Sequence, residues 1–346
     1  MKVLLTGHRG YIGSVLGPLL RERGHDVVGL DSDLFDGCDF TPLDTIPAIK
    51  IDLRDVQKEH LVGFDAVMHL AALSNDPLSD LDPNLTYDIN HRASVALAAK
   101  AKQAGVPRFI FSSSCSLYGA AGDDFLNETA GFNPVTAYGE SKVLVERDVR
   151  PMADDKFSPT FLRNATAYGV SPRLRGDLVV NNLVGYAFTT GEVLIKSDGT
   201  PWRPLVHLRD IAAAFIAVLE APRELVHGES FNVGQTAENY RIREVADMVQ
   251  EIVPGSKVEY AADGGPDLRC YRVDCSKIAR VLPNFKPQWT VRKGIEELYE
   301  AYQQNGLTLQ DLQGARYIRL ARIRERMNAG TIDNTLRTRA AVLSYA

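Results

Sequence analysis

Three glycines close to the amino terminus constrain the fold more than any other feature. Gly7, Gly10 and Gly13 form a GxxGxxG run that directly follows a short apolar segment, residues 2–6, and precedes a helical pattern over residues 11–22. Glycines at such a turn let backbone amides approach a diphosphate, because no Cβ atoms stand in the way, and the helix amino terminus adds partial positive charge. The run therefore predicts a dinucleotide-binding turn between a strand and a helix.

The segments that follow alternate between short apolar strands and helical stretches. Further strands are predicted at residues 26–30, 48–51, 66–70, 108–112 and 160–163. Helices are predicted at residues 84–104 and 137–150. This alternation is typical of a parallel sheet with helices on both faces, so the predicted fold class is α/β, with a Rossmann-type doubly wound parallel sheet.

Glycines and prolines punctuate the second half of the chain and indicate a smaller lobe. We predict a Rossmann domain over residues 1–165, to which later segments such as 205–235 return, and a C-terminal substrate-binding lobe over mainly 166–306. Residues 307–346 are expected to form a helical extension. Its arginines alternate with apolar residues: Arg316, Arg319, Arg322, Arg324 and Arg326. This spacing predicts an amphipathic helix with a basic face, packed on the body or on a partner subunit.

Composition narrows the class of function. A net charge of −5 over 346 residues offers no basic footprint for nucleic acid. No apolar run approaches the roughly 18 residues of a transmembrane helix, so we expect no membrane partner. The four cysteines include no CxxC pair, and no His cluster has metal-ligand spacing, so we expect neither a metal site nor a disulfide framework. A reducing, cytoplasmic setting is the expectation that follows.

An acidic residue follows the second predicted strand. Asp31 lies where a carboxylate can accept hydrogen bonds from the adenosine ribose and repel a 2′-phosphate, which favours NAD over NADP. Arg9, in the glycine turn, could instead neutralise a 2′-phosphate, so NADP stays as the less favoured alternative. Asp52 and Leu53 end the third predicted strand and could bracket the adenine.

A tyrosine and a lysine four residues apart carry the candidate chemistry. Tyr138 and Lys142 share one face of a predicted helix. A nearby ammonium stabilises a phenolate, so the tyrosine can exchange a proton with a sugar hydroxyl while hydride moves to or from a nicotinamide. Ser114, at the end of a central strand, can bond to the reacting oxygen, whereas Ser112 and Ser113 either make turn bonds or contact the cofactor.

The order of these motifs resembles the extended short-chain dehydrogenase/reductase family, in particular its NAD-dependent nucleotide-sugar epimerases, dehydratases and ketoreductases. The resemblance extends from residue 1 to about residue 302 and also rests on HLAA at residues 69–72 and on SSS before a YG pair. It implies that Ser114, Tyr138 and Lys142 are the catalytic trio. It also implies a homodimer in which helices 84–104 and 137–150 of two subunits pair.

The resemblance extends to the residues around the cofactor and substrate. The implied cofactor contacts are Gly7, Arg9, Gly10, Tyr11, Ile12, Gly13, Asp31, Asp52, Leu53, Leu70, Ala71, Ala72, Asn90, Ser112, Tyr138 and Lys142. Asn90 matches an asparagine that supports the catalytic lysine in relatives. The implied contacts to a nucleotide-diphosphate sugar are Ser116, Asn164, Thr166, Asn182, Leu183, Arg203 and Arg269. Arg203 is expected to clamp the diphosphate, and Arg269 is favoured over Arg272 as a second phosphate ligand. Residues 163–166 depart from the RYFN of epimerases, which leaves the pose of the sugar open.

The two residues after Ser114 separate the reactions known in the family. Related 4,6-dehydratases carry an Asp-Glu pair there, and related decarboxylases keep the Glu, whereas this chain has Cys115 and Ser116. Neither is a good general acid at neutral pH, so hydride transfer at one carbon remains. The first hypothesis is a 4-epimerase that acts through a transient 4-keto intermediate, and the alternative is an NAD(P)H-dependent keto-sugar reductase. A non-catalytic NAD(H) sensor is the least favoured, because such proteins typically lose the Tyr or the Lys.

Overall fold

The computed structural model describes all residues except 75–77, 79–80, 196, 261–268 and 339–346. Its centre is a seven-stranded parallel sheet in the order β11-β7-β5-β4-β1-β2-β3. The strands are β1 (Lys2–Thr6), β2 (Asp26–Asp31), β3 (Ala48–Lys50), β4 (Ala66–His69), β5 (Arg108–Ser114), β7 (Ser158–Asn164) and β11 (Ser230–Val233). The strand order reverses between β1 and β4, which is where open α/β sheets bind their ligands. The predicted α/β doubly wound fold is confirmed.

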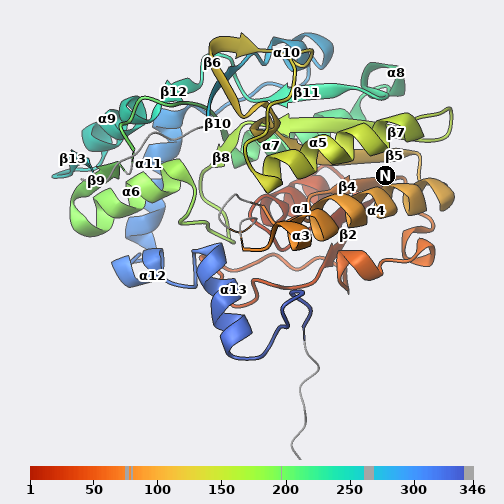
Figure 1. The fold of residues 1–346 in the computed structure, drawn as a ribbon, viewed down its shortest axis with the longest axis horizontal. Coiled ribbons are helices and arrows are strands. Elements are labelled where there is room, and N and C mark those ends of the chain that lie inside the picture. The colour runs from red at the N-terminus through yellow and green to blue at the C-terminus, as the bar shows by residue number, and fades with distance from the viewer. Residues whose placement is uncertain (75–77, 79–80, 196, 261–268, 339–346) are drawn as a thin grey trace, which may run out of the picture.

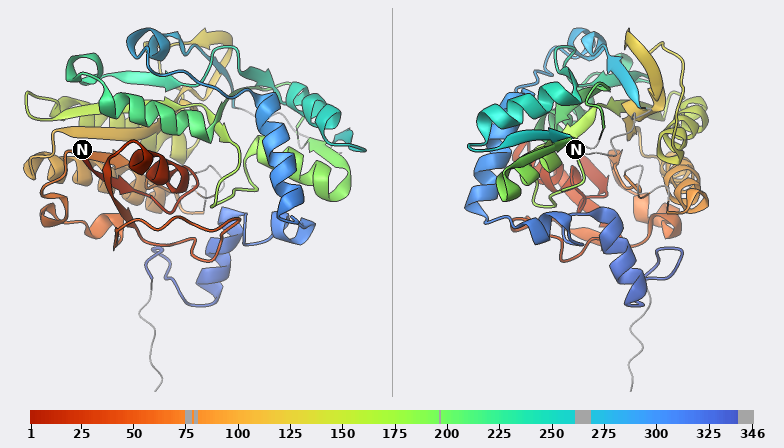
Figure 2. Two further views of the ribbon diagram at one scale, coloured as in Figure 1. Left: turned by 180° about the vertical axis from the view of Figure 1, so that it is seen from behind. Right: turned by 60° about the vertical axis from the view of Figure 1, so that its left-hand side comes forward.

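Helices cover both faces of the sheet, and this explains why its strands are apolar without alternation. Successive residues of β1 point to opposite faces: Leu4 packs with α4 (Ala93–Gln103) and α5 (Ala137–Val149), and Leu5 packs with α1 (Gly13–Glu22) and α7 (Leu208–Glu220). Figure 1 shows α4 and α5 in front of the sheet, and the left view of Figure 2 shows α1 and α7 on the opposite side. The sheet therefore lies buried between two helical layers.

The helix predicted over residues 84–104 consists of three consecutive segments. A short α3 (Pro83–Thr86) is followed by a π-helical turn, Tyr87–Arg92, and then by α4. Asp82 caps α3 by accepting a hydrogen bond from the N–H of Asn84 at 2.9 Å. π-helical turns widen a helix locally and are frequent at functional sites. Here the turn carries Asn90, whose contacts are described below.

The smaller lobe has its own core beside the sheet. A three-stranded sheet is formed by β12 (Asn239–Arg241), β10 (Trp202–His207) and β8 (Thr166–Tyr168). Its helices are α6 (Val179–Thr190), α9 (Ile242–Ile252) and α11 (Val291–Gln304). Two-stranded pairs complete it: β9 (Glu192–Ile195) with β13 (Lys257–Tyr260), and β6 (Ala120–Leu126) with β14 (Cys270–Val273). A further helix, α8 (Arg223–Val226), precedes β11, and α10 (Ser276–Val281) follows β14.

The carboxyl-terminal extension is not the single basic helix that its arginine spacing predicted. It contains two short helices, α12 (Leu309–Gln313) and α13 (Arg319–Asn328), which are interrupted at Gly314. Three of its arginines donate hydrogen bonds to backbone carbonyls of residues 33–39 and one is buried, so they do not form one solvated basic face. The donors are Arg316, Arg322 and Arg326. Residues 339–346 lie outside the described part of the chain. No helix of the described residues has the length and apolar content that a membrane span needs.

Candidate active site

A cavity of about 1080 Å³ follows the carboxyl edge of the sheet, between the sheet and the smaller lobe. Its lining comes from the turn between β1 and α1, from the ends of β2, β4, β5 and β7, and from the lobe. Every predicted catalytic, cofactor and substrate residue lines this cavity except Asn90. The structure thus gathers residues that lie far apart in the sequence around one continuous space.

The glycine turn leaves its backbone open to the cavity. A Cβ atom at Gly13 would lie 2.1 Å from the carbonyl oxygen of Gly7, and one at Gly7 would lie 2.8 Å from the amide nitrogen of Ala71. Neither position has room for a side chain, and Gly7 has a φ of +73°, which favours glycine. The first turn of α1 carries no acidic residue and no side-chain cap, so its positive end is unscreened. This turn fits the diphosphate of a dinucleotide.

Asp31 is held at the end of β2 by two backbone amides. Its carboxylate accepts hydrogen bonds from the N–H of Arg9 and from the N–H of Asp33, both at 3.0 Å. The Arg9 guanidinium turns away to ion pairs with Asp33 at 3.0 Å and Asp36 at 3.2 Å. Arg9 is thus neutralised by carboxylates of the protein itself. The surroundings of Asp31 favour a ribose diol over a 2′-phosphate.

The end of β3 closes the same part of the cavity. Asp52 forms an ion pair with Arg54 at 2.7 Å, and Leu53, which separates them in the sequence, is buried. Burial alone would raise the pKa of Asp52, but the hydrogen bonds from Arg54 lower it below its usual value. Asp52 therefore stays ionised and paired.

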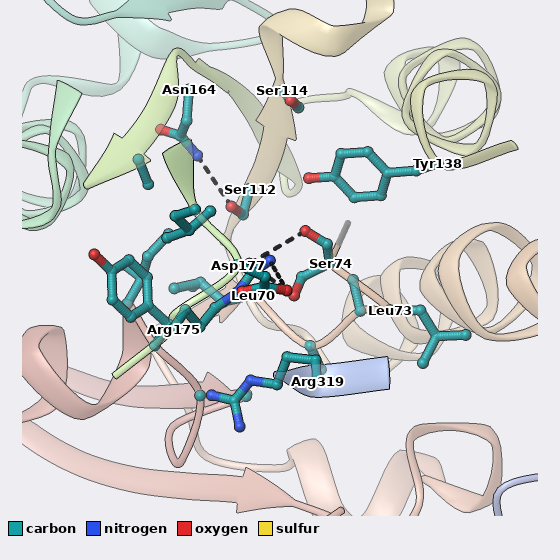
Figure 3. A pocket seen from close by; sticks show the side chains of 18 of the residues that line it. Leu70, Leu73, Ser74, Ser112, Ser114, Tyr138, Asn164, Arg175, Asp177 and Arg319 are labelled. Carbon is teal, nitrogen blue, oxygen red and sulfur yellow. Dashed lines mark hydrogen bonds and ion pairs between the residues drawn. The ribbon is translucent and has the colours of Figure 1, made fainter. Parts of the chain in front are cut away.

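Helix α5 presents Tyr138 and Lys142 to the cavity. Its amino terminus is fixed by Thr136, whose Oγ1 accepts a hydrogen bond from the N–H of Gly139 at 3.1 Å. Lys142 is 3% exposed, and its Nζ donates a hydrogen bond to the carbonyl of Ser112 at 2.8 Å and lies 5.4 Å from the centre of the Tyr138 ring. Figure 3 shows the Tyr138 hydroxyl pointing from α5 towards the end of β5.

Burial tunes the ammonium group beside that tyrosine. Desolvation lowers the pKa of Lys142 to about 7, against the opposing effect of Glu146 one helical turn further on. A lysine with such a pKa changes its charge close to neutral pH. It can therefore take part in the proton balance of the tyrosine next to it.

The residues after β5 bring a hydroxyl, and not a carboxylate, to the cavity. Ser114 Oγ donates a hydrogen bond to Ser116 Oγ and accepts one from the N–H of Ser116, both at 3.1 Å. Cys115 points away: its Sγ lies 3.1 Å from the carbonyl oxygen of Arg163, and burial raises its pKa well above the usual value. The pair 115–116 thus supplies neither an acid nor a base at neutral pH.

An asparagine at the end of β7 faces the same space. Asn164 Nδ2 donates hydrogen bonds to Ser112 Oγ at 3.1 Å, as Figure 3 shows, and to the carbonyl of Ser113 at 3.2 Å. Its buried Oδ1 has no hydrogen-bond partner among the described residues. In the lobe, Asn182 donates to the carbonyl of Gly176 at 2.7 Å.

Two arginines of the lobe meet at the far end of the cavity. Arg203 is 6% exposed and donates hydrogen bonds to the carbonyls of Trp202, at 2.8 Å, and of Arg269. Arg272 lies elsewhere, because it donates to the carbonyl of Asp123 and stacks on the ring of Trp202. Of the two candidates, Arg269 lines the cavity and Arg272 does not.

Asn90 lies behind the cavity wall. Its Oδ1 accepts a hydrogen bond from the N–H of Leu73 at 2.8 Å, and its Nδ2 donates to the carbonyl of Leu73 at 2.9 Å and to Ser141 Oγ at 3.4 Å. It thereby ties the chain after β4 to the residue before Lys142. No described contact joins it to Lys142 itself.

The sequence analysis missed several charged residues of the cavity wall, among them a group after β8 and one arginine of α13. Arg175 makes a two-pronged ion pair with Asp177, at 2.9 and 3.1 Å, and donates a hydrogen bond to Ser74 Oγ at 3.3 Å (Figure 3). Arg173 is 1% exposed, and Arg319 enters from α13 with an exposure of 3%. The cluster of two arginines and an aspartate after β8 was the available signal. The spacing of Arg319 and its neighbouring arginines predicts a solvent-facing helix, and so gives no sign of its burial.

Comparison with known proteins places the chain in a family. Residues 3–234 match the NAD dependent epimerase/dehydratase family. The UDP-glucose 4-epimerase of Corynebacterium glutamicum is 31% identical over 267 residues, which cover 73% of this chain and 80% of that protein. The UDP-glucose 4-epimerase of Bacillus subtilis is 27% identical over 329 residues, or 86% of this chain and 94% of that protein.

The fold of the chain is also similar to that of a solved structure. MoeE5 in complex with UDP-glucuronic acid and NAD is similar with a TM-score of 0.77 and 28% identity, over 88% of this chain and 99% of that one. The glycine turn, the acid after β2 and the Ser-Tyr-Lys trio lie within the matched residues 3–234. The chain belongs to the NAD-dependent epimerase/dehydratase family.

Proposed function

We propose that the protein is an NAD-dependent nucleotide-sugar 4-epimerase. The main support for this proposal is the set of residues at one end of the cavity. Ser114, Tyr138 and Lys142 converge there with Ser116, while Cys115 is turned away into the core. This set can move one proton and support hydride transfer at one carbon. It lacks the acid and base that elimination of water needs at the adjoining position.

The other end of the cavity suits the adenosine half of NAD. The open glycine turn would hold the diphosphate, and the fixed carboxylate of Asp31 would accept hydrogen bonds from the ribose. Asp52 and Leu53 would border the adenine. When bound, NAD supplies the acceptor and donor of hydride at the reacting carbon.

The chain's own residues would manage the proton. Tyr138 Oη takes the proton of the sugar 4-hydroxyl as the C4–H bond gives up its hydride, and it returns that proton when hydride comes back to the opposite face. Lys142 stabilises the phenolate, and Ser114 holds the reacting oxygen through a hydrogen bond. Atoms and electrons balance, because the hydride and the proton removed from the substrate are both restored to the product.

The far end of the cavity would hold the nucleotide diphosphate. Arg203 and Arg269 meet there, and guanidinium groups bind phosphate oxygens well. Asn164, Thr166 and Asn182 also line the cavity and would contact the sugar. The relatives named above are UDP-glucose 4-epimerases, which supports a UDP-hexose as the substrate.

A panel of substrates tests this function. Purified protein would be incubated with UDP-, dTDP-, GDP- and CDP-sugars, with NAD and without NADH, and the products would be followed by NMR. The proposal predicts that two C4 epimers of one UDP-sugar interconvert to equilibrium. Turnover only with a keto-sugar, with one NADH consumed per product, would identify a reductase instead.

We further propose a homodimer that pairs α4 and α5 of two subunits. Their outer sides keep apolar residues that the described chain covers only in part: Val95, Ala99, Val143 and Leu144. A mass of about 38 kDa by light scattering at micromolar concentration, equal to one chain, would contradict this proposal. A cytoplasmic location remains a prediction, which the low cysteine content supports.

A further inference from the structure

Arg319 is a buried cation that forms no ion pair with an acidic residue in the described part of the chain. It is 3% exposed, its Nη2 donates only to the carbonyl of Arg173 at 3.4 Å, and its guanidinium stacks on the ring of Phe35 at 4.0 Å. Its buried Nη1 has no hydrogen-bond partner among the described residues. The carboxylate that most affects its pKa, Asp177, is already bound by Nε and Nη2 of Arg175. A charge so placed costs free energy unless a ligand compensates it.

The surroundings of Arg319 increase this cost. Desolvation and the neighbouring positive charge of Arg175 lower the pKa of the Arg319 guanidinium to about 10. It still carries its full charge at neutral pH. The protein therefore keeps a positive group that forms no ion pair with the residues the structure describes, and a group of this kind suits an anionic ligand.

Arg319 lies in the wall of the cavity. Both Ile318 and Arg319 belong to the cavity lining, and Figure 3 shows Arg319 extending along the cavity wall from the beginning of α13. The first turn of α13 has neither a side-chain cap nor an acidic residue, so the positive end of this ten-residue helix is unscreened at the same place. Two sources of positive charge thus converge on one stretch of the wall.

The extension crosses from one rim of the cofactor end to the other. On one side, Arg326 donates hydrogen bonds to the carbonyls of Asp33 and Leu34, at 3.0 and 2.9 Å, and Arg54 donates to the carbonyl of Thr335 at 2.8 Å. On the other side, the extension shares an apolar cluster with the segment after β4. Its members from the extension are Leu320, Ile323, Met327, Ile332 and Leu336, and those from the other rim include Leu73, Leu85 and Ile89.

We propose that the C-terminal extension is a strap over the cofactor end of the cavity, and that Arg319 binds the diphosphate of the dinucleotide from the side opposite the glycine turn. The inference rests on the proposed position of NAD in this cavity. The contacts of the strap with residues 33–34 place it beside Asp31, where the adenosine half would lie, and away from Arg203 and Arg269. Release of NAD then requires the strap to give way, which suits an enzyme that returns hydride to the same substrate and has no need to exchange its cofactor.

The test is Arg319→Met, with Arg324→Met as its matched control on the exposed side of the same helix. Calorimetry on cofactor-free protein would measure the affinity for three probes. ADP-ribose carries the diphosphate of the cofactor, and adenosine lacks it. UDP carries the diphosphate of the proposed substrate. We expect Arg319→Met to weaken ADP-ribose binding roughly 10- to 100-fold, as for loss of a hydrogen bond to a charged group, and to leave adenosine and UDP unchanged. NAD should dissociate faster by a similar factor, and Arg324→Met should match the wild type.

A second readout separates this role from a structural one. Because Arg319 is an uncompensated buried charge, the cofactor-free Arg319→Met protein should melt no lower than the wild type. A lower melting temperature with unchanged ADP-ribose affinity would overturn the inference, since Arg319 would then only hold the fold. Weaker binding of UDP alone would also overturn it, by assigning the charge to the substrate, and so would an equal loss for adenosine. A wild-type protein that binds neither NAD nor ADP-ribose would refute the proposed function itself, and this inference with it.

Discussion

Replacing Gly13 with alanine should strongly weaken NAD binding and leave the rest of the fold in place. The new Cβ would lie 2.1 Å from the carbonyl oxygen of Gly7 and 2.8 Å from the Cα of His8, and both are backbone atoms that cannot rotate away. To bring the Gly7 oxygen to 3.0 Å from the new Cβ, the turn must move by about 0.9 Å relative to α1. Amide-to-phosphate hydrogen bonds do not survive such a displacement. The loss of two such hydrogen bonds, at about 1.5–3 kcal/mol each, weakens the affinity for NAD at least about 100-fold.

Gly17 provides a matched control one helical turn further along α1. A Cβ there would lie 3.5 Å from Ile46 Cδ1 and 3.6 Å from Leu5 Cδ2, which are ordinary contacts. Alanine is favoured over glycine inside a helix by about 0.5–1 kcal/mol, so Gly17→Ala should stabilise the protein by about that amount. Its affinity for NAD should equal that of the wild type.

Calorimetric titration with NAD and urea unfolding of both variants would test this pair. Circular dichroism would check that Gly13→Ala retains its secondary structure, so that a loss of binding can be assigned to the turn. An NAD affinity of Gly13→Ala within threefold of the wild type would refute the reasoning. A destabilised Gly17→Ala would show that the packing around α1 is tighter than the structure has it.

Four further changes test the chemistry and the buried charges. Tyr138→Phe should keep NAD affinity and lose nearly all turnover, since only the proton-transferring group is removed; retained turnover would exclude Tyr138 from the mechanism. Lys142→Met should also lose turnover. Folding lowers the pKa of Lys142 from about 10.5 to about 7, so the wild type gains stability as pH rises through that window. The variant's melting temperature should therefore exceed that of the wild type near pH 7, and the difference should vanish towards pH 10; a constant difference would contradict this. Asp31→Asn should bring the NADP affinity closer to the NAD affinity, whereas an unchanged ratio in titrations would assign the discrimination elsewhere. Glu146→Gln leaves Arg163 buried without its 2.7 Å ion pair and should lower the free energy of unfolding, measured in urea, by about 3–5 kcal/mol. A decrease below about 1 kcal/mol would contradict the burial of this pair.

The sheet was predictable because its strands carry a simple physical signal. Parallel strands buried on both faces become short apolar runs that end at small or polar residues, as in Val3–Leu4–Leu5 and Phe109–Ile110–Phe111. Strand β6 lacks this signal, since its residues are mostly exposed and include Asp123 and Asp124. It forms through pairing with β14, about 150 residues later in the chain, and no local sequence pattern predicts this pairing.

The site was predictable where its residues lie at fixed positions on strand and helix ends. Gly7, Ser114 and Tyr138 belong to such local motifs, and the structure brings them to one cavity. Arg173 and Arg319 were missed because their burial depends on distant segments. Arg173 bonds to the carbonyl of Phe35, and Arg319 is buried against that ring and against Arg173. Sequence patterns place arginines at the surface, so tertiary contacts alone could reveal these two.

The central claim is that the same hydride leaves C4 of the sugar and returns to it. Its most direct test uses a UDP-hexose that carries deuterium at C4, incubated with the enzyme and its bound NAD but no added NADH, with NMR of both epimers. We expect that the product epimer keeps the deuterium at C4 and that no free NADH accumulates. A product epimer that carries hydrogen in place of deuterium at C4, or no epimer at all without added NADH, would contradict this proposal.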